Sequence, residues 1–219
     1  MALVLHEKLL THSEFAVWRI EEDDSFYLKK LILSYSEREF INAIKHPAQK
    51  TRWLASRYLL KYLMQTDVFV ELLADDQGKP FIRNFDLHIS ISHSNNYVAV
   101  FISNTHTVGI DVEESSRNIM ALKNKFLSQT ELQQLSESVL QKQLIVYWAA
   151  KEVIYKIYGK RKLEFKDDMY IKPFSLHGKG TIDGVLMKHG AVLSYNLNYY
   201  QNDDFTLVTG TDSGIEKLT

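Results

Sequence analysis

Cysteine is absent from the 219-residue sequence, which excludes disulfide bonds, thiolate metal sites and cysteine nucleophiles. The absence also fits a reducing compartment, and we expect the protein to be cytoplasmic. Proline occurs only 3 times and no low-complexity tract is present, so no flexible linker is predicted. No run approaches ~18 uninterrupted apolar residues, so no membrane helix is expected. The opening stretch MALVLHEKLL contains an acid and no long apolar core, so no signal peptide is expected either.

The sequence also has little net charge. Its 26 Lys and Arg residues nearly balance 27 Asp and Glu residues, and the formal net charge of −1 argues against a broad nucleic-acid-binding surface. Hydrophobic residues make up 45% and charged residues 24%, as is usual for globular proteins. The length permits one large domain or two smaller ones, each with its own core.

The most informative stretch is GIDVE at residues 109–113. Apolar and polar side chains alternate here, and this period of two predicts a strand. Asp111 and Glu113 would then project from the same side, where two carboxylates repel each other unless a cation lies between them. A divalent ion that prefers oxygen ligands would suit such a pair. A solvated acidic edge strand is the simpler interpretation of this stretch taken alone.

Three alternating segments, residues 87–92, 97–103 and 107–113, are separated by short turns. They predict an antiparallel meander in which each strand pairs with the next. The first strand ends in Ser92 and His93, two strands away from the acidic one. His93 could donate to an anion there, or it could be a turn histidine bonded to the backbone.

Two amphipathic helices are predicted, over residues 48–64 and 139–158. Each follows a shorter helix that opens with a capping box, in which a serine hydroxyl accepts from a free helix N–H and a glutamate three residues later reaches back. The boxes are assigned to Ser36 with Glu39 and to Ser128 with Glu131. Gly159 ends the second long helix.

The two halves resemble each other. LSYSE at residues 33–37 matches LSQTE at 127–131, and the stretch TRWLASRYLLKYL matches VYWAAKEVIYKIY. This repeat predicts an α+β fold of two similar, pseudo-symmetric lobes, each an antiparallel sheet packed with helices. The lobes are assigned to residues 1–106 and 107–219, with the active site at their interface, because ligand sites favour such places.

The second long helix carries Trp148, Glu152 and Lys156 at intervals of four residues, so the three share one face. Glu152 occupies the position that Arg57 holds in the first copy. A surface Glu–Lys salt bridge worth a few tenths of a kcal/mol would also explain this spacing.

Four motifs occur in a fixed order: Gly78-Lys79-Pro80, residues 91–94 (ISHS), residues 108–113 (VGIDVE) and residues 148–156 (WAAKEVIYK). Together they resemble the 4′-phosphopantetheinyl transferases of the large, monomeric Sfp-like type. These enzymes transfer the phosphopantetheine arm of coenzyme A to a serine of a carrier protein and release 3′,5′-ADP. The resemblance runs from Arg52 onward, with a valine where the family usually has alanine or serine in the last motif, and the first fifty residues match poorly.

The resemblance implies a role for each matched residue. Asp111, Glu113 and Glu152 would hold Mg²⁺, or alternatively Mn²⁺, against the pyrophosphate of coenzyme A. Lys156 would contact the pyrophosphate and protonate the departing oxygen. Glu152 is the expected base toward the serine hydroxyl, directly or through a metal-bound water, so the expected catalytic residues are Glu152, Lys156 and Asp111. Coenzyme A binding is further assigned to Arg52, Lys79, Ser92 and His93.

The expected partner is an acidic acyl or peptidyl carrier protein, with no nucleic acid and no membrane involved. Residues 115–126, which include Arg117, Lys123 and Lys125, are the predicted docking segment. A monomer is expected because one chain already supplies two lobes. Two other functions stay open: a different Mg²⁺-dependent phosphodiester-processing enzyme, and a non-enzymatic module that binds coenzyme A or a protein.

Overall fold

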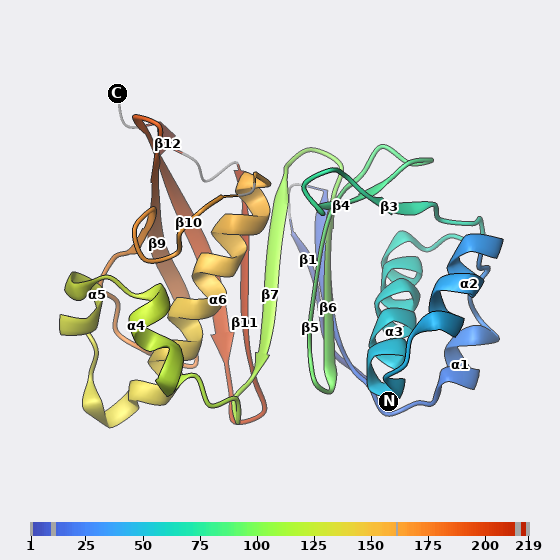
Figure 1. The fold of residues 1–219 in the computed structure, drawn as a ribbon, viewed down its shortest axis with the longest axis horizontal. Coiled ribbons are helices and arrows are strands. Elements are labelled where there is room, and N and C mark those ends of the chain that lie inside the picture. The colour runs from blue at the N-terminus through green and yellow to red at the C-terminus, as the bar shows by residue number, and fades with distance from the viewer. Residues whose placement is uncertain (1, 10–11, 161, 213–215, 218–219) are drawn as a thin grey trace.

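The computed structural model describes residues 2–9, 12–160, 162–212 and 216–217. The fold is mixed α+β, with antiparallel sheets packed against helices (Figure 1). In the part of the chain that is described, no helix is both long enough and apolar enough to cross a membrane.

The first sheet has the strand order β1-β2-β6-β5. Its strands, all antiparallel to their neighbours, are β1 (Leu3–Leu9), β2 (Ser13–Arg19), β5 (His88–Ser94) and β6 (Tyr97–Ser103). A separate hairpin pairs β3 (Leu72–Ala74) with β4 (Pro80–Ile82). The sequence pattern predicted β5 and β6 but not β1, which forms an edge of the sheet.

Helices α1 (Asp24–Leu28), α2 (Tyr35–Ala43) and α3 (Pro47–Met64) lie together on one side of the first sheet (Figure 1). The first capping box was assigned to the wrong residues. Ser34 is the N-cap: its hydroxyl accepts from the Glu37 amide, and the Glu37 carboxylate accepts from the Ser34 amide. Both Ser34 and Ser36 have a glutamate three residues later, but only Ser34 has the extended backbone of a cap, while Ser36 lies inside the helix.

The second sheet has the order β7-β11-β10-β9-β8, and β12 also pairs with β10. Its strands are β7 (Val108–Glu114), β8 (Met169–Ile171), β9 (Lys179–Lys188), β10 (Ala191–Gln201), β11 (Phe205–Thr211) and β12 (Glu216–Lys217). The helices are α4 (Lys123–Phe126), α5 (Gln129–Gln133) and α6 (Leu140–Tyr158), with 3₁₀ turns at Met120–Leu122 and Glu137–Val139. Ser128 and Glu131 form the predicted capping box, and Gly159 ends α6 with φ of 68°.

The predicted three-stranded meander is wrong at its third strand. β5 and β6 form a hairpin, but β7 pairs with β11 of the second sheet, Asp111 opposite Val208. The turn after β6 carries the chain from one sheet to the other, so the partner of β7 comes from almost one hundred residues later in the sequence. The alternative interpretation of this stretch as a solvated acidic edge is wrong, because every residue of β7 is buried.

β7 instead lies beside β5, and we call these two adjacent strand edges the seam (Figure 1). Serine hydroxyls of β5 join them. Ser90 Oγ accepts from the Ile110 amide at 3.1 Å, and Ser94 Oγ accepts from the Glu114 amide at 3.2 Å. Ser92 Oγ donates to the Asp111 carboxylate at 2.7 Å. Hydrogen bonds of serine side chains therefore connect β5 to β7, whereas backbone hydrogen bonds connect the strands within each sheet.

Hydrophobic clusters fill the spaces between these layers. One packs α3 against the first sheet through Leu54, Leu59 and their neighbours, and another packs α6 against the second sheet. A third lies between the sheets and joins Phe15 and Phe101 to Val108, Ile110 and Val112 and their neighbours. The apolar face of β7 is therefore buried against the first sheet. Its other face, which carries Asp111 and Glu113, lies toward α6.

Gly109 allows α6 to approach β7 closely. A Cβ placed there would lie 2.7 Å from the Val153 carbonyl oxygen and 2.8 Å from Ile157 Cγ1. Gly210, opposite Gly109 on β11, also faces α6: a Cβ there would lie 3.2 Å from Ile157 Cδ1 and 3.3 Å from Val153 Cγ1, with Leu197 Cδ2 of β10 closer still. These glycines set the depth at which the helix residues Glu152 and Lys156 meet the strand.

We expect Gly109→Ala to lower the free energy of unfolding by about 1–3 kcal/mol, because the added methyl overpacks the contact between β7 and α6. Urea unfolding followed by circular dichroism measures the change. Gly178→Ala is the matched control, since its Cβ would meet only the Gln201 carbonyl oxygen at 3.7 Å. Equal stability of the two variants would contradict the role given to Gly109.

Candidate functional site

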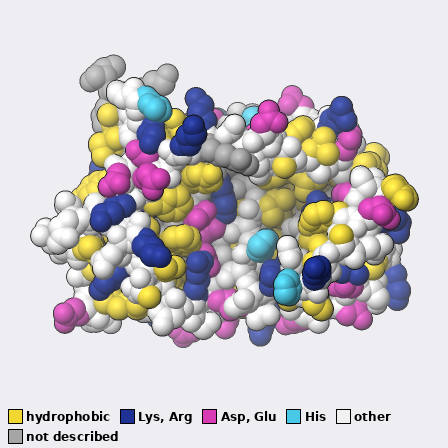
Figure 2. All heavy atoms as spheres, in the orientation of Figure 1, with side chains coloured by type: hydrophobic (Ala, Val, Ile, Leu, Met, Phe, Trp, Pro, Cys, Tyr) yellow, Lys and Arg dark blue, Asp and Glu magenta, His cyan; other side chains and the backbone are white. Residues whose placement is uncertain are grey.

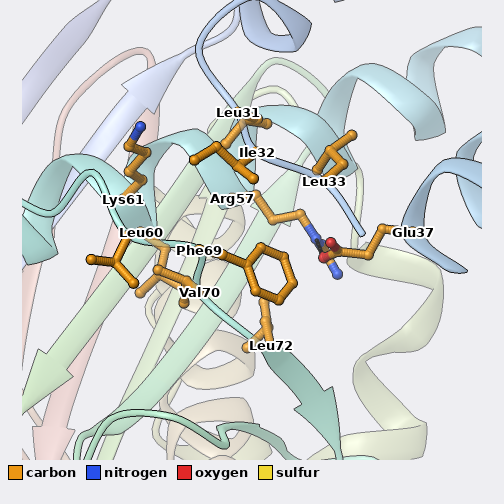
Figure 3. Close-up of a pocket in the computed structure, with 11 residues that line it drawn as sticks. Leu31, Ile32, Leu33, Glu37, Arg57, Leu60, Lys61, Phe69, Val70 and Leu72 are labelled. Carbon is orange, nitrogen blue, oxygen red and sulfur yellow. Dashed lines mark hydrogen bonds and ion pairs between the residues drawn. The ribbon is translucent and has the colours of Figure 1, made fainter. Parts of the chain in front are cut away.

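The pocket drawn in Figure 3 lies in the first half of the chain and has a mainly apolar lining. Its volume of about 20 Å³ holds about one water molecule. Arg57 and Glu37 point toward each other at its edge and form an ion pair of 3.3 Å. The pocket is too small for a substrate and contains none of the predicted site residues, so it does not provide the functional site.

A larger pocket, about 220 Å³, lies at the seam. Lys79, Glu152 and Lys156 line it, together with Ser90 and other residues of β5. Figure 2 shows a hollow between the two halves of the molecule, with acidic side chains on one wall and histidine and basic side chains on the other. Such a hollow can accept a ligand that carries negative charge and requires cations.

Asp111 is the residue where the halves meet. Its side chain is 5% exposed, and Oδ1 accepts from Ser92 Oγ of β5 and, at 2.8 Å, from Lys156 Nζ of α6. Lys156 Nζ also donates to the Ile110 carbonyl at 2.7 Å. Among the described residues, nothing donates a hydrogen bond to the second oxygen, Oδ2, although it is buried. A buried carboxylate oxygen without a donor is well suited to a cation.

Glu113 lies one pleat farther along β7, and its carboxylate is surrounded by donors. Oε1 accepts from Trp148 Nε1 at 3.0 Å and from the Arg117 guanidinium, while Oε2 accepts from Ser94 Oγ at 3.2 Å. Burial raises the pKa of Glu113, and the negative charge of Asp111 raises it further, whereas the bond from Arg117 acts in the opposite direction.

Glu152 projects from α6 toward the same two carboxylates. Burial raises the pKa of Glu152 to about 7, and repulsion from Asp111 and Glu113 contributes, while Lys156 opposes the shift. Glu152 forms no hydrogen bond or ion pair with another described residue. It is therefore the member of the carboxylate group that is free to exchange a proton near neutral pH.

The predicted coenzyme A residues fall into two places. Lys79 lies in the seam pocket, where Nζ approaches the Ile157 carbonyl at 3.5 Å, and burial lowers its pKa. His93 lies on β5 close enough to Arg52 of α3 for charge to act between them. Desolvation and then the positive charge of Arg52 lower the pKa of His93, although its side chain reaches solvent. Arg52 and His93 lie outside the lining of the seam pocket.

The surroundings of the three carboxylates determine whether these side chains can bind a metal ion. Within the described residues, no group of three or more His, Cys, Asp and Glu side chains is arranged to hold a metal ion. Yet Asp111, Glu113 and Glu152 offer the oxygen donors that Mg²⁺ and Mn²⁺ accept, repel one another, and include the orphaned Oδ2. The donor set fits a divalent ion, but Glu113 is already engaged.

Sequence reasoning missed several residues that build the site. Ser90 and Ser94 bind the β7 backbone, and their signal was present in the alternation that singled out Ser92. Trp148 was placed on the correct helix face, but its hydrogen bond to Glu113 was not foreseen. The ion pair of Arg117 with Glu113 was also missed, because it forms across the turn after β7 and no local period predicts it.

Residues 107–206 match the family model of the 4′-phosphopantetheinyl transferase superfamily. This segment contains both β7 and α6, and hence Asp111, Glu113, Glu152 and Lys156. The resemblance found in the motifs is confirmed over this part of the chain.

Curated relatives carry the same family name. The 4′-phosphopantetheinyl transferase gsp of Aneurinibacillus migulanus is 33% identical over 110 residues, which cover 49% of this chain and 46% of that protein. The 4′-phosphopantetheinyl transferase psf-1 of Bacillus pumilus is 31% identical over 90 residues, 39% of this chain and 38% of that protein. The 4′-phosphopantetheinyl transferase AcpT of Escherichia coli (strain K12) is 31% identical over 117 residues, 51% of this chain and 59% of that protein. The chain thus spans about half the length of the relatives it matches.

The raised pKa of Glu152 predicts a pH dependence of stability without metal. An unfolded glutamate titrates near 4.5, and the folded one near 7, so the folded state loses stability as pH rises between these values. Glu152→Gln removes this loss. The stability of the wild type relative to Glu152→Gln should therefore fall from about pH 5 to about pH 8, by as much as about 3 kcal/mol at 1.4 kcal/mol per pKa unit. Urea unfolding in EDTA measures it, and a constant difference would contradict the assignment.

Proposed function

We propose that this protein transfers the 4′-phosphopantetheine arm of coenzyme A to a serine of an apo acyl or peptidyl carrier protein, releasing 3′,5′-ADP. The observation that carries the proposal is the meeting of Asp111, Glu113, Glu152 and Lys156 at one seam, two from a strand and two from a helix about forty residues later. The match of residues 107–206 to the 4′-phosphopantetheinyl transferase superfamily supports it, as does the similarity of the chain to relatives named as transferases.

The reaction first requires that the negative charges of the carboxylates and the pyrophosphate be neutralised. Coenzyme A brings a pyrophosphate to a wall that already holds three carboxylates, and Asp111, Glu113 and Glu152 would hold a Mg²⁺ or Mn²⁺ ion between them and the phosphates. When bound, the ion supplies positive charge and Lewis acidity toward the reacting phosphorus.

Glu152 and Lys156 move the protons. Glu152 takes the proton of the carrier serine hydroxyl, which is a poor nucleophile until it is deprotonated. A carboxylate within reach of the hydroxyl can act as this base. The serine oxygen bonds to phosphorus, the bond to 3′,5′-ADP breaks, and Lys156 donates a proton to the departing oxygen. Its position 2.8 Å from Asp111 Oδ1 fixes the ammonium beside the acidic strand.

Binding of coenzyme A is assigned to cations along the hollow. Lys79, in the seam pocket, and Arg52, beside His93, would hold the nucleotide end. His93 would donate to a phosphate, which a neutral histidine can do through one ring nitrogen. Ser92 would hold the acidic strand in place through its bond to Asp111.

We further propose that residues 1–106 and 107–219 form pseudo-symmetric lobes, whose outermost residues lie outside those described. In each half the capping-box glutamate pairs with a cation of the long helix: Glu37 with Arg57, and Glu131 with Lys151. The large, monomeric Sfp-like type, and a cytoplasmic location, follow from the same proposal. The carrier is proposed to be acidic and to dock on residues 115–126.

Incubation with coenzyme A, Mg²⁺ and an apo-carrier should add one phosphopantetheine arm, roughly 340 Da from its formula, to a carrier serine. Mass spectrometry of the intact carrier measures the gain. Glu152→Gln should slow the reaction by roughly 10²–10⁴-fold, as expected on removing a general base.

The same assay separates the other functions. Cleavage of coenzyme A without a change in carrier mass would identify a phosphodiester hydrolase, and binding without either change would identify a non-enzymatic module. Full activity in EDTA would contradict the use of a metal.

Charge reversal on the docking segment should act on one substrate only. Lys123→Glu with Lys125→Glu should raise KM for the carrier several-fold and leave KM for coenzyme A unchanged, because an acidic partner is repelled. Steady-state kinetics with each substrate varied in turn provides the measurement. Equal effects on both substrates would exclude this segment as the docking surface.

A further inference from the structure

Arg117 forms an ion pair with the Glu113 carboxylate. It lies four residues after Glu113, just beyond the end of β7, and its guanidinium donates to Oε1. The backbone around it is tied down as well, because the Arg117 amide donates to the Glu114 carbonyl and the Gln141 side chain donates to the Arg117 carbonyl. The side chain is nevertheless 34% exposed, so the contact is at the edge of the site and open to exchange.

A divalent ion at Glu113 would repel the Arg117 guanidinium, which donates to the same carboxylate. Trp148 and Arg117 share Oε1, and Ser94 takes Oε2. The three carboxylates repel one another, yet they form no metal-binding group in the described residues. Two cations balance part of their charge instead: Lys156 pairs with Asp111, and Arg117 pairs with Glu113. Of these, Lys156 also donates to a backbone carbonyl, whereas the hydrogen bond of the Arg117 guanidinium within the described part of the chain goes to the Glu113 carboxylate.

We propose that Arg117 is an internal counter-ion that the divalent metal displaces from Glu113, and that its release delivers a guanidinium to the docking segment. The proposal rests on the metal site and the carrier of the proposed function. It adds that metal binding and carrier binding are linked through one side chain, because Arg117 cannot neutralise Glu113 and an acidic group of the carrier at the same time.

The Arg117 guanidinium can remain in contact with the Trp148 ring after its release from Glu113. Its carbon already lies 5.1 Å from the centre of the Trp148 ring, within the range of a cation–π contact, so it can leave Glu113 without leaving that ring. Lys123 and Lys125 follow on the same segment. An acidic carrier that docks there would meet a third cation only after Glu113 has bound its metal.

Binding of Mn²⁺, followed by electron paramagnetic resonance with and without coenzyme A, tests the competition apart from catalysis. Arg117→Gln should bind Mn²⁺ roughly three- to tenfold more tightly than the wild type, because the ion pair no longer competes. Lys142→Gln is the matched control: it also removes one positive charge, from an exposed α6 lysine that pairs with Asp203, and should leave the affinity unchanged.

Nuclear magnetic resonance of arginine Nε–H groups gives a second readout. The signal that is missing from the Arg117→Gln spectrum should shift when Mg²⁺ is added to the wild type. Equal or weaker Mn²⁺ binding by Arg117→Gln, or an unmoved Arg117 signal, would overturn the proposal and identify Arg117 as a fixed support for Glu113. An equal gain in the Lys142→Gln control would also overturn it, by showing a general effect of charge.

These outcomes are separable from the proposed function. A wild type that binds Mn²⁺ and modifies the carrier, with no gain in Arg117→Gln, rejects the counter-ion alone. A wild type that binds no Mn²⁺, with or without coenzyme A, rejects both the counter-ion and the metal site, and the carrier mass then decides whether transfer itself survives.

Discussion

The site depends on one buried carboxylate that is bonded from both halves of the molecule. Asp111 accepts one hydrogen bond from the Ser92 hydroxyl of the first sheet and another from the Lys156 ammonium of α6. Loss of Lys156 would leave the buried charge of Asp111 without its counter-ion, which costs far more than a surface ion pair contributes. The depth of α6, set by Gly109, and the register of the seam are therefore constrained by the same carboxylate.

Repulsion among acids explains the remaining electrostatics. The charge of Asp111 raises the pKa of both Glu113 and Glu152, and Glu113 raises that of Glu152 further. Lys156 and Arg117 neutralise Asp111 and Glu113 by direct contact, whereas Glu152 has no such partner among the described residues, and burial with this repulsion raises its pKa to about 7. The residue left without a partner is the one suited to proton transfer, so its reactivity follows from the distribution of the two cations.

Local patterns predicted the parts of the site, and tertiary pairing limited the rest. Alternation placed Asp111 and Glu113 on one side of a strand, and spacing of four placed Glu152 and Lys156 on one helix face, because both periods are properties of the backbone. The partner of β7 could not be predicted, since β11 lies nearly one hundred residues away and no local signal distinguishes a hairpin to β6 from a crossing to another sheet. The Ser34 cap was missed because two serines satisfy the same motif, and only the backbone decides between them.

The seam adds a constraint that no single motif contains. Ser90, Ser92 and Ser94 bind β7 at successive positions of the same face, so the two sheets are held in register by hydroxyls at every second residue. A slip of one residue that brought Ile91 opposite Asp111 in place of Ser92 would leave the carboxylate without its hydroxyl donor. The polar side of ISHS is thus as much a determinant of the acidic strand as GIDVE itself. The two motifs are best understood as one interface, in which the serines set the register and the charge of Asp111 penalises any other.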